Sequence, residues 1–175
     1  MATLDSAPTR LLVVMRHARA ESWGESDHER RLAEQGRADA AAAGHWLAEQ
    51  GIAPDHALVS SATRTRETWE AVAGAAGWSL APVFDDGLYS ASPDTTLDLM
   101  RETPDEARVL FVLGHNPTVA FLAQMLDDGD GDPAASADMA GGYPTCALTV
   151  LRFEGGWSDL AMASASVTAF HVGRD

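Results

Sequence analysis

Short apolar runs alternate along the chain with segments in which apolar residues recur at helical spacing. Leu11–Met15 and Val109–Leu113 are unbroken apolar runs, which are typical of strands buried on both faces of a sheet. The predicted strands are Leu11–Met15, Ala57–Ser60, Val83–Phe84, Val109–Leu113, Leu148–Phe153 and Leu160–Phe170. The predicted helices lie between them, at about 33–50, 62–76, 93–101 and 117–126.

This order of elements predicts an α/β protein: a three-layer α/β/α sandwich around a mainly parallel sheet. The last two strands follow one another across Gly155-Gly156, so we expect an antiparallel strand at one edge. Residues 127–142 are rich in Asp, Gly, Ala and Ser, which indicates a surface loop. Residues 1–9 are predicted to be a flexible tail and residues 10–175 a single domain, without repeats or linkers.

Composition narrows the classes of partner. The formal net charge of -14 disfavours nucleic acid and anionic membranes as partners, because both repel an acidic protein. Leu11–Met15 is too short to span a membrane. The single cysteine, Cys146, excludes an internal disulfide and fits a reducing compartment, so we expect a soluble, cytoplasmic protein.

Polar residues with phosphate-binding chemistry follow three of the predicted strands. Arg16-His17 comes directly after the first strand, Arg64 lies one helical turn beyond Ser60, and His115-Asn116 follows the fourth strand. Ligands of open α/β sheets bind beyond the carboxyl ends of the strands. Each residue alone has an ordinary structural explanation, but two guanidinium groups and two imidazoles at one edge of an acidic protein indicate an oxyanion site.

These segments resemble the histidine phosphatase superfamily, and within it the short SixA-type phosphohistidine phosphatases, which have a phosphoglycerate mutase-like fold. The resemblance covers most of the chain, from about Leu11 to Phe153, and both the order and the spacing of its motifs agree. The matching blocks are LLVVMRHARAE (11–21), the R-x-L-x-x-x-G residues Arg30, Leu32 and Gly36, the S-x(3)-R-x(3)-T residues Ser60, Arg64 and Thr68, LYSASPD (88–94), GHNPTVAFLAQML (114–126) and YPTCALTVLRF (143–153). Ala18 departs from the pattern, since the superfamily signature has glycine there.

The resemblance implies a metal-independent phosphatase that needs no cofactor. His17 would attack phosphorus and form a covalent phosphohistidine, while Arg16, Arg64 and His115 hold the phosphoryl oxygens. Asn116 and Ser60 would also contact the phosphoryl group. A neutral imidazole is required for attack, and neighbouring cations favour that form by lowering its pKa.

The substrate implied by the resemblance is phosphorylated, and a protein carrying phosphohistidine fits it best. Larger relatives place a glutamate, which protonates the leaving oxygen of an ester, near the position of Ser90. A small-molecule phosphomonoesterase or a phosphoglycerate mutase-like enzyme is the alternative, which Ser90 disfavours because it cannot act as that acid. A phosphate-binding module without catalysis is the other alternative, which the presence of both His17 and His115 disfavours. We expect a monomer or a weak dimer.

Overall fold

A computed structural model describes residues 7–175, so residues 1–6 of the predicted tail lie outside the described residues. Six strands form one sheet in the order β3-β2-β4-β1-β5-β6. The strands are β1 (Thr9–Arg16), β2 (His56–Ser60), β3 (Val83–Asp85), β4 (Val109–Gly114), β5 (Ala147–Glu154) and β6 (Ala165–Val172). The first four strands are parallel, and β5 runs antiparallel to both β1 and β6. The sheet is thus mainly parallel, with antiparallel pairing at one edge, as predicted.

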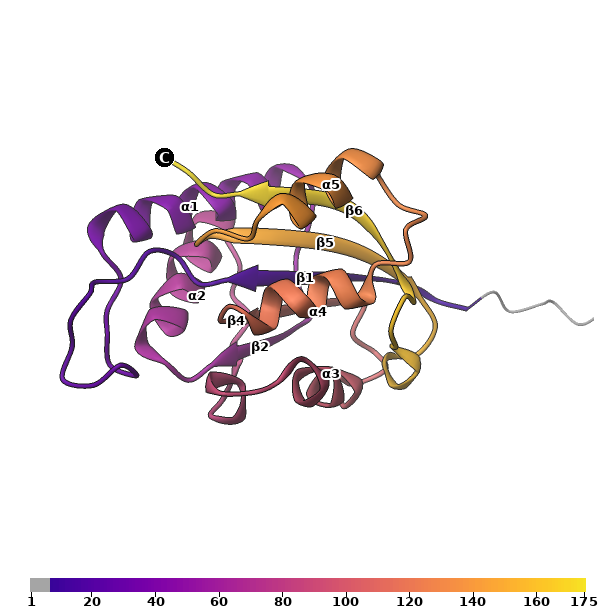
Figure 1. Cartoon of the computed structure of the whole chain (residues 1–175), viewed down its shortest axis with the longest axis horizontal. Coiled ribbons are helices and arrows are strands. Elements are labelled where there is room, and N and C mark those ends of the chain that lie inside the picture. The colour runs from indigo at the N-terminus through magenta and orange to yellow at the C-terminus, as the bar shows by residue number, and fades with distance from the viewer. Residues whose placement is uncertain (1–6) are drawn as a thin grey trace, which may run out of the picture.

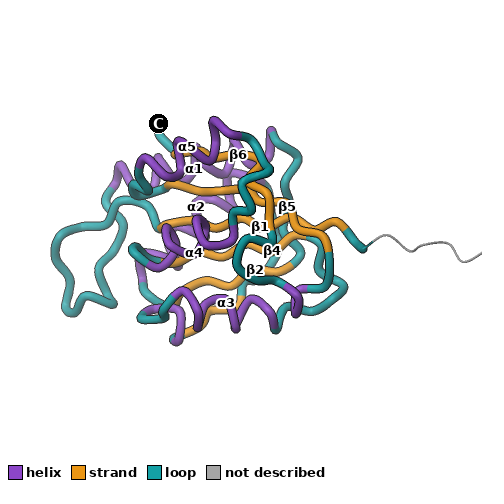
Figure 2. Tube along the Cα trace, turned by 45° about the vertical axis from the view of Figure 1, so that its right-hand side comes forward, coloured by secondary structure: helices purple, strands orange, loops and turns teal. Residues whose placement is uncertain are grey.

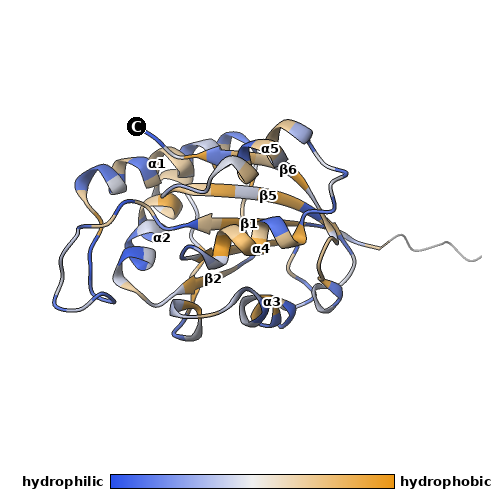
Figure 3. Cartoon of the chain, in the orientation of Figure 1, coloured by the Kyte–Doolittle hydropathy of each residue, from blue (hydrophilic) through white to orange (hydrophobic). Residues whose placement is uncertain are grey.

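Helices cover both faces of the sheet and complete three layers (Figure 1). The helices are α1 (Glu34–Glu49), α2 (Thr63–Ala76), α3 (Pro93–Arg101), α4 (Thr118–Leu126) and α5 (Pro133–Gly141). Val13 and Met15 of β1 point toward α1 and α2, while Leu12 and Val14 point toward the other three helices. The strands are apolar on both faces because each face is covered, and Figure 3 shows this apolar colour along the central strands. None of the helices in residues 7–175 is long and apolar enough to cross a membrane.

The second half of the predicted surface loop is a helix, so the prediction for residues 127–142 is wrong there. Asp132 caps α5, because its carboxylate accepts a hydrogen bond from the Ala135 amide at 2.8 Å. Pro133 supplies the first helical residue, where its missing N–H has no cost. Only Ala135 and Met139 of this helix are buried, so its short sequence carries too weak an apolar period to be recognised.

The connection between the last two strands is also longer than predicted. Residues 157–159 form a turn of 3-10 helix, and β6 begins only at Ala165, not at Leu160. Trp157 explains the difference, since its indole is fully buried and its Nε1 donates to the Ala107 carbonyl at 2.9 Å. The chain therefore detours to bury Trp157 before it enters the edge strand.

The carboxyl ends of the parallel strands all lie at one end of the molecule. A long loop over residues 17–33 leaves β1 there and projects beyond the sheet before α1 begins, as the tube in Figure 2 shows. This end brings together the residues that the sequence singled out.

Candidate active site

The candidate site lies where three adjacent parallel strands end. β1 lies next to β4, and β4 lies next to β2. His17 follows β1, His115 follows β4 and Ser60 is the last residue of β2. The rings of His17 and His115 have their centroids 5.3 Å apart. Strand order therefore accounts for how residues distant in sequence come together.

His17 is held as a neutral imidazole with a defined tautomer. Its Nδ1 lies 2.7 Å from the Ala18 carbonyl oxygen, which can only accept, so Nδ1 carries the hydrogen. The pKa of His17 is lowered to about 4, first by burial and then by the charges of Arg64 and Arg16, although the bond to Ala18 acts in the opposite direction. At neutral pH Nε2 consequently keeps its lone pair, as a nucleophile requires.

His115 is half-buried beside His17 and is held by Ser60. Its Nε2 lies 2.7 Å from the Ser60 hydroxyl oxygen. Burial lowers the pKa of His115 to about 3, and the neighbouring His17 and Arg64 act in the same direction. Ser60 is itself fully buried, so its contact with His115 fixes the imidazole ring. This places Ser60 behind His115.

Both arginines are anchored through their terminal nitrogens. Arg16 Nη1 donates to the Tyr143 carbonyl at 3.0 Å, and Asn116 Nδ2 donates to the same oxygen at 2.8 Å. Arg64 donates from Nη1 and Nη2 to the backbone and side chain of Asp27, at 2.8 and 3.2 Å. In both guanidinium groups the Nε–H edge stays free of these anchors.

Unpaired polar atoms are concentrated among these residues. Within residues 7–175, five buried side-chain polar atoms have no hydrogen-bond partner, and four of them belong to this site. They are Arg16 Nε, Arg64 Nε, His115 Nδ1 and Asn116 Oδ1. Because unpaired buried polar groups are costly, such a cluster is typical of a site built for a polar ligand. We call Arg16, His17, Arg64, His115 and Asn116 the oxyanion site.

Two residues that the sequence analysis missed complete the surroundings of Arg64. The Asp27 carboxylate accepts from the Tyr89 hydroxyl at 2.5 Å as well as from Arg64. The Tyr89 ring lies beneath the Arg64 guanidinium, 5.8 Å from its carbon, and contacts His115 edge-on. The hydrogen bond from Tyr89 and the charges of Arg64 and Arg30 lower the pKa of Asp27 to about 2. Asp27 lies 37 residues from Arg64 on an irregular loop, so no spacing signal marks it.

The remaining motif residues hold the loop that carries His17. The Ala18 amide donates to the Thr68 hydroxyl at 3.0 Å, and this hydroxyl donates to the Arg64 carbonyl at 2.7 Å. A Cβ on Gly36 would lie 2.0 Å from the Arg19 carbonyl oxygen, so only glycine lets α1 approach the loop. The Ala18 methyl group is fully buried and fits this arrangement. The departure from the signature glycine therefore leaves the local fold intact.

Comparison with known proteins agrees with this geometry. A model of the histidine phosphatase superfamily (branch 1) matches residues 12–92. An uncharacterized protein of Mycobacterium tuberculosis is 36% identical over 162 residues, which cover 91% of this chain and 100% of that protein. A SixA from Nakamurella multipartitia, assigned as a phosphohistidine phosphatase, is 34% identical with a TM-score of 0.82 over 95% of this chain and 98% of its own. The chain belongs to the histidine phosphatase superfamily.

Its SixA-type resemblance is confirmed by a second solved structure. A protein from Agrobacterium tumefaciens, also assigned as a SixA phosphohistidine phosphatase, is 32% identical with a TM-score of 0.73, over 85% of this chain and 94% of its own. The phosphoglycerate mutase-like α/β fold predicted from the sequence is therefore confirmed. As a histidine phosphatase, the protein is a hydrolase of phosphorylated substrates.

Proposed function

We propose that this histidine phosphatase hydrolyses phosphohistidine in a substrate protein, through a covalent phosphohistidine on His17. The observation that carries the proposal is the state of His17: its Nδ1 is tied to the Ala18 carbonyl, and its lowered pKa leaves Nε2 unprotonated. Such a ring can attack phosphorus without a base to deprotonate it. The names of the two solved SixA relatives point to the same substrate.

The oxyanion site supplies charge where the transition state needs it. The Nε–H groups of Arg16 and Arg64 would bind equatorial phosphoryl oxygens, and the Nδ1–H tautomer of His115 would donate a third hydrogen bond. Ser60 would select that tautomer by donating to His115 Nε2. Asn116 is fixed by Tyr143 beside Arg16 and would border the same oxygens. These roles require no metal ion or other cofactor.

Two in-line transfers complete the reaction. In the first, a bond forms between His17 Nε2 and phosphorus while the substrate P–N bond breaks, and the leaving nitrogen takes the electron pair. A substrate imidazole that is protonated on its other nitrogen then leaves as a neutral ring. In the second, water attacks phosphorus, His17 Nε2 recovers its electron pair, and the water protons pass to phosphate and solvent.

The chemistry of the leaving group supports phosphohistidine over alkyl phosphates. An alkoxide must be protonated as it leaves, which needs a carboxylic acid close to the bridging oxygen. Ser90 cannot supply that proton, and Asp27, which contacts the oxyanion site, has a pKa of about 2 and is ionised at neutral pH. An imidazole leaving group has no such need. We place this reaction in the cytoplasm and expect the enzyme to act as a monomer or weak dimer.

A panel of substrates tests the proposal. Wild-type enzyme is assayed on a phosphohistidine protein, an aryl phosphate, a sugar phosphate and a phosphoglycerate, and the kcat/KM values are compared. We expect phosphohistidine to be the best substrate, the aryl phosphate to be intermediate and the alkyl phosphates to be poorest. A steep preference for one alkyl phosphate would overturn the substrate assignment.

A further inference from the structure

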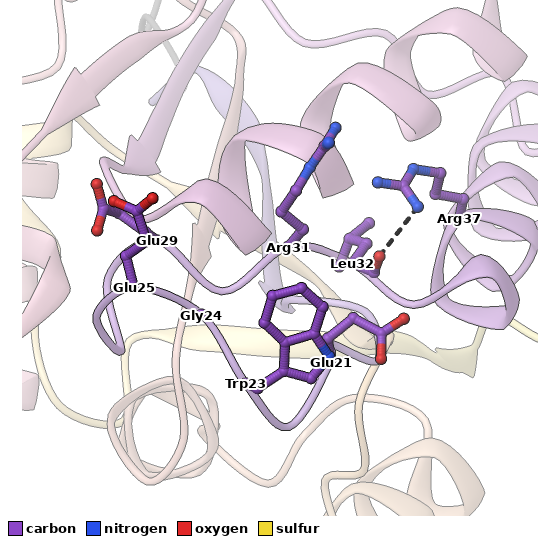
Figure 4. A pocket seen from close by; sticks show the side chains of 8 residues that line it. All are labelled: Glu21, Trp23, Gly24, Glu25, Glu29, Arg31, Leu32 and Arg37. Carbon is purple, nitrogen blue, oxygen red and sulfur yellow. Dashed lines mark hydrogen bonds between the residues drawn. The ribbon is translucent and has the colours of Figure 1, made fainter.

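The loop between β1 and α1, together with the first turn of α1, forms a surface cavity. Its volume is about 540 Å³, and Figure 4 shows its lining. The lining residues are Glu21, Trp23, Gly24, Glu25, Glu29, Arg31, Leu32 and Arg37. No residue of the oxyanion site belongs to this lining, so the phosphoryl chemistry does not account for what we call the Trp23 cavity.

Trp23 is presented to solvent on a well-braced loop. Its side chain is 76% exposed, which is unusual for so large an apolar group. The loop beneath it is braced by a bridge between Ala20 and Leu32, and Arg30 Nη1 donates to the Glu21 carbonyl at 2.9 Å. A loop that is held in place before binding loses little entropy on contact, and tryptophan is enriched among the strongest contact residues of interfaces.

The charges that face this tryptophan are unbalanced. Arg31 and Arg37 share the single carboxylate of Glu67, at 2.8 and 3.0 Å, so one of their two charges is offset, while three other carboxylates line the cavity. Among residues 7–175, neither Glu21 nor Glu25 makes an ion pair. Figure 4 shows Glu21 on one side of the indole and Glu25 with Glu29 on the other. An aromatic face flanked by carboxylates attracts a cation.

A second hollow extends from Trp23 toward Asp27. It measures about 390 Å³, shares Trp23 and Gly24 with the first cavity, and is lined further on by Asp27 and Arg30. Asp27 is the residue that anchors Arg64. A single stretch of loop, from Trp23 to Asp27, therefore links the Trp23 cavity to the anchor of Arg64.

We propose that the Trp23 cavity binds a lysine or arginine side chain of the substrate protein, close in space to its phosphohistidine. The cation would lie against the Trp23 indole, between the carboxylates of Glu21 and Glu25. This inference rests on the proposed function, because it assigns the part of a protein substrate that lies beyond the phosphoryl group. It makes Trp23 a specificity-determining residue with no part in the chemical step.

Paired substrates separate this role from catalysis. A phosphohistidine peptide flanked by lysines, the same peptide flanked by glutamines, and phosphoimidazole are assayed with wild type and with Trp23→Ala. We expect Trp23→Ala to lower kcat/KM on the lysine peptide about tenfold, through KM, as the loss of one partly desolvated cation–π contact predicts. Phosphoimidazole turnover should stay within about twofold of wild type, since the oxyanion site is untouched.

Two further variants test whether the preference for the lysine peptide comes from the carboxylates of the Trp23 cavity. Glu21→Gln combined with Glu25→Gln should remove the wild-type preference for the lysine peptide while leaving the glutamine peptide unchanged. Phe121→Ala is the control, because Phe121 of α4 is also exposed, at 58%, but lies outside the cavity lining. Equal activity of wild type and Trp23→Ala on the lysine peptide would overturn the inference. Absence of wild-type turnover on all three substrates would instead refute the proposed function.

Discussion

The oxyanion site and the Trp23 cavity lie at the same end of the sheet but are built in opposite ways. The oxyanion site collects buried and half-buried residues from the ends of three parallel strands and from α2, and its polar groups are anchored from behind by backbone carbonyls, Ser60 and Asp27. The Trp23 cavity is formed by one loop and the first turn of α1, and its three carboxylates make no ion pair among the described residues. A preorganised, desolvated site suits the chemical step, whereas an open and charged one suits recognition of a large partner.

The largest effect on activity is expected from removing the anchored charge of Arg64. Arg64→Ala should lower kcat on every substrate, peptide or small molecule, by about a hundredfold or more, because a preorganised charge is lost from the transition state. Steady-state kinetics on the aryl phosphate and on both peptides measure it. A loss of kcat confined to the peptides would contradict the assignment of the chemical step to the oxyanion site and of recognition to the Trp23 cavity.

Arg66→Ala provides the matched control for that variant. Arg66 lies two residues further along α2, but its guanidinium stacks on Phe84 with its carbon 3.9 Å from the ring centroid, and its Nε donates to the Ser61 carbonyl. Its removal takes away the same charge from the same helix without touching the oxyanion site. Comparable losses in the two variants would mean that Arg64 acts only through the general field of the protein.

An intermediate effect is expected at Asp27, which anchors Arg64 and lines the second hollow beside Trp23. Asp27→Asn keeps an oxygen able to accept from Arg64 but loses the negative charge that holds the guanidinium, so kcat on the aryl phosphate should fall about tenfold. Glu29→Gln, on the same loop, changes a carboxylate that bonds only Ser26, and it should leave this rate unchanged. Equal rates for Asp27→Asn and wild type would show that Asp27 does not contribute to the reaction.

The smallest expected effect is on stability, and it concerns His17 of the oxyanion site. The pKa of folded His17 is about 4, below the ordinary value of 6.5, so the unfolded chain binds a proton more readily as the pH falls. Stability is therefore lost on acidification, by about 1 kcal/mol between pH 7 and pH 5.5 from this group. His17→Asn should remove that part of the pH dependence in urea unfolding, whereas His45→Asn, at an exposed position, should not.

The sequence alone brings the residues of the candidate site to one edge because apolar runs locate strand ends. Leu11–Met15 and Val109–Leu113 fix where His17 and His115 emerge, and parallel order then brings them to one edge. Residues that act from the intervening loop follow no such rule. Asp27 and Tyr89 meet across 62 residues, through a contact that depends on how the loop folds back over the strand ends.

Elements made of small residues are the other failure of prediction. Helix α5 was expected to be loop because alanine, glycine and serine give little apolar contrast, and its helix-start signal of Asp132-Pro133 lay within an acidic, glycine-rich segment. No pattern in the sequence predicts the Trp23 cavity either. A tryptophan in a chain with five of them is expected in the core, and only its 76% exposure sets Trp23 apart.

Trapping the phosphoenzyme tests the central claim most directly. Wild-type enzyme is mixed with a slowly hydrolysed aryl phosphate, quenched in alkali, digested and analysed by mass spectrometry, with His17→Ala treated in parallel. The account predicts an alkali-stable, acid-labile phosphate on His17, approaching one per chain, and none in the variant. Phosphate found instead on His115, or turnover by His17→Ala at the wild-type rate, would contradict it.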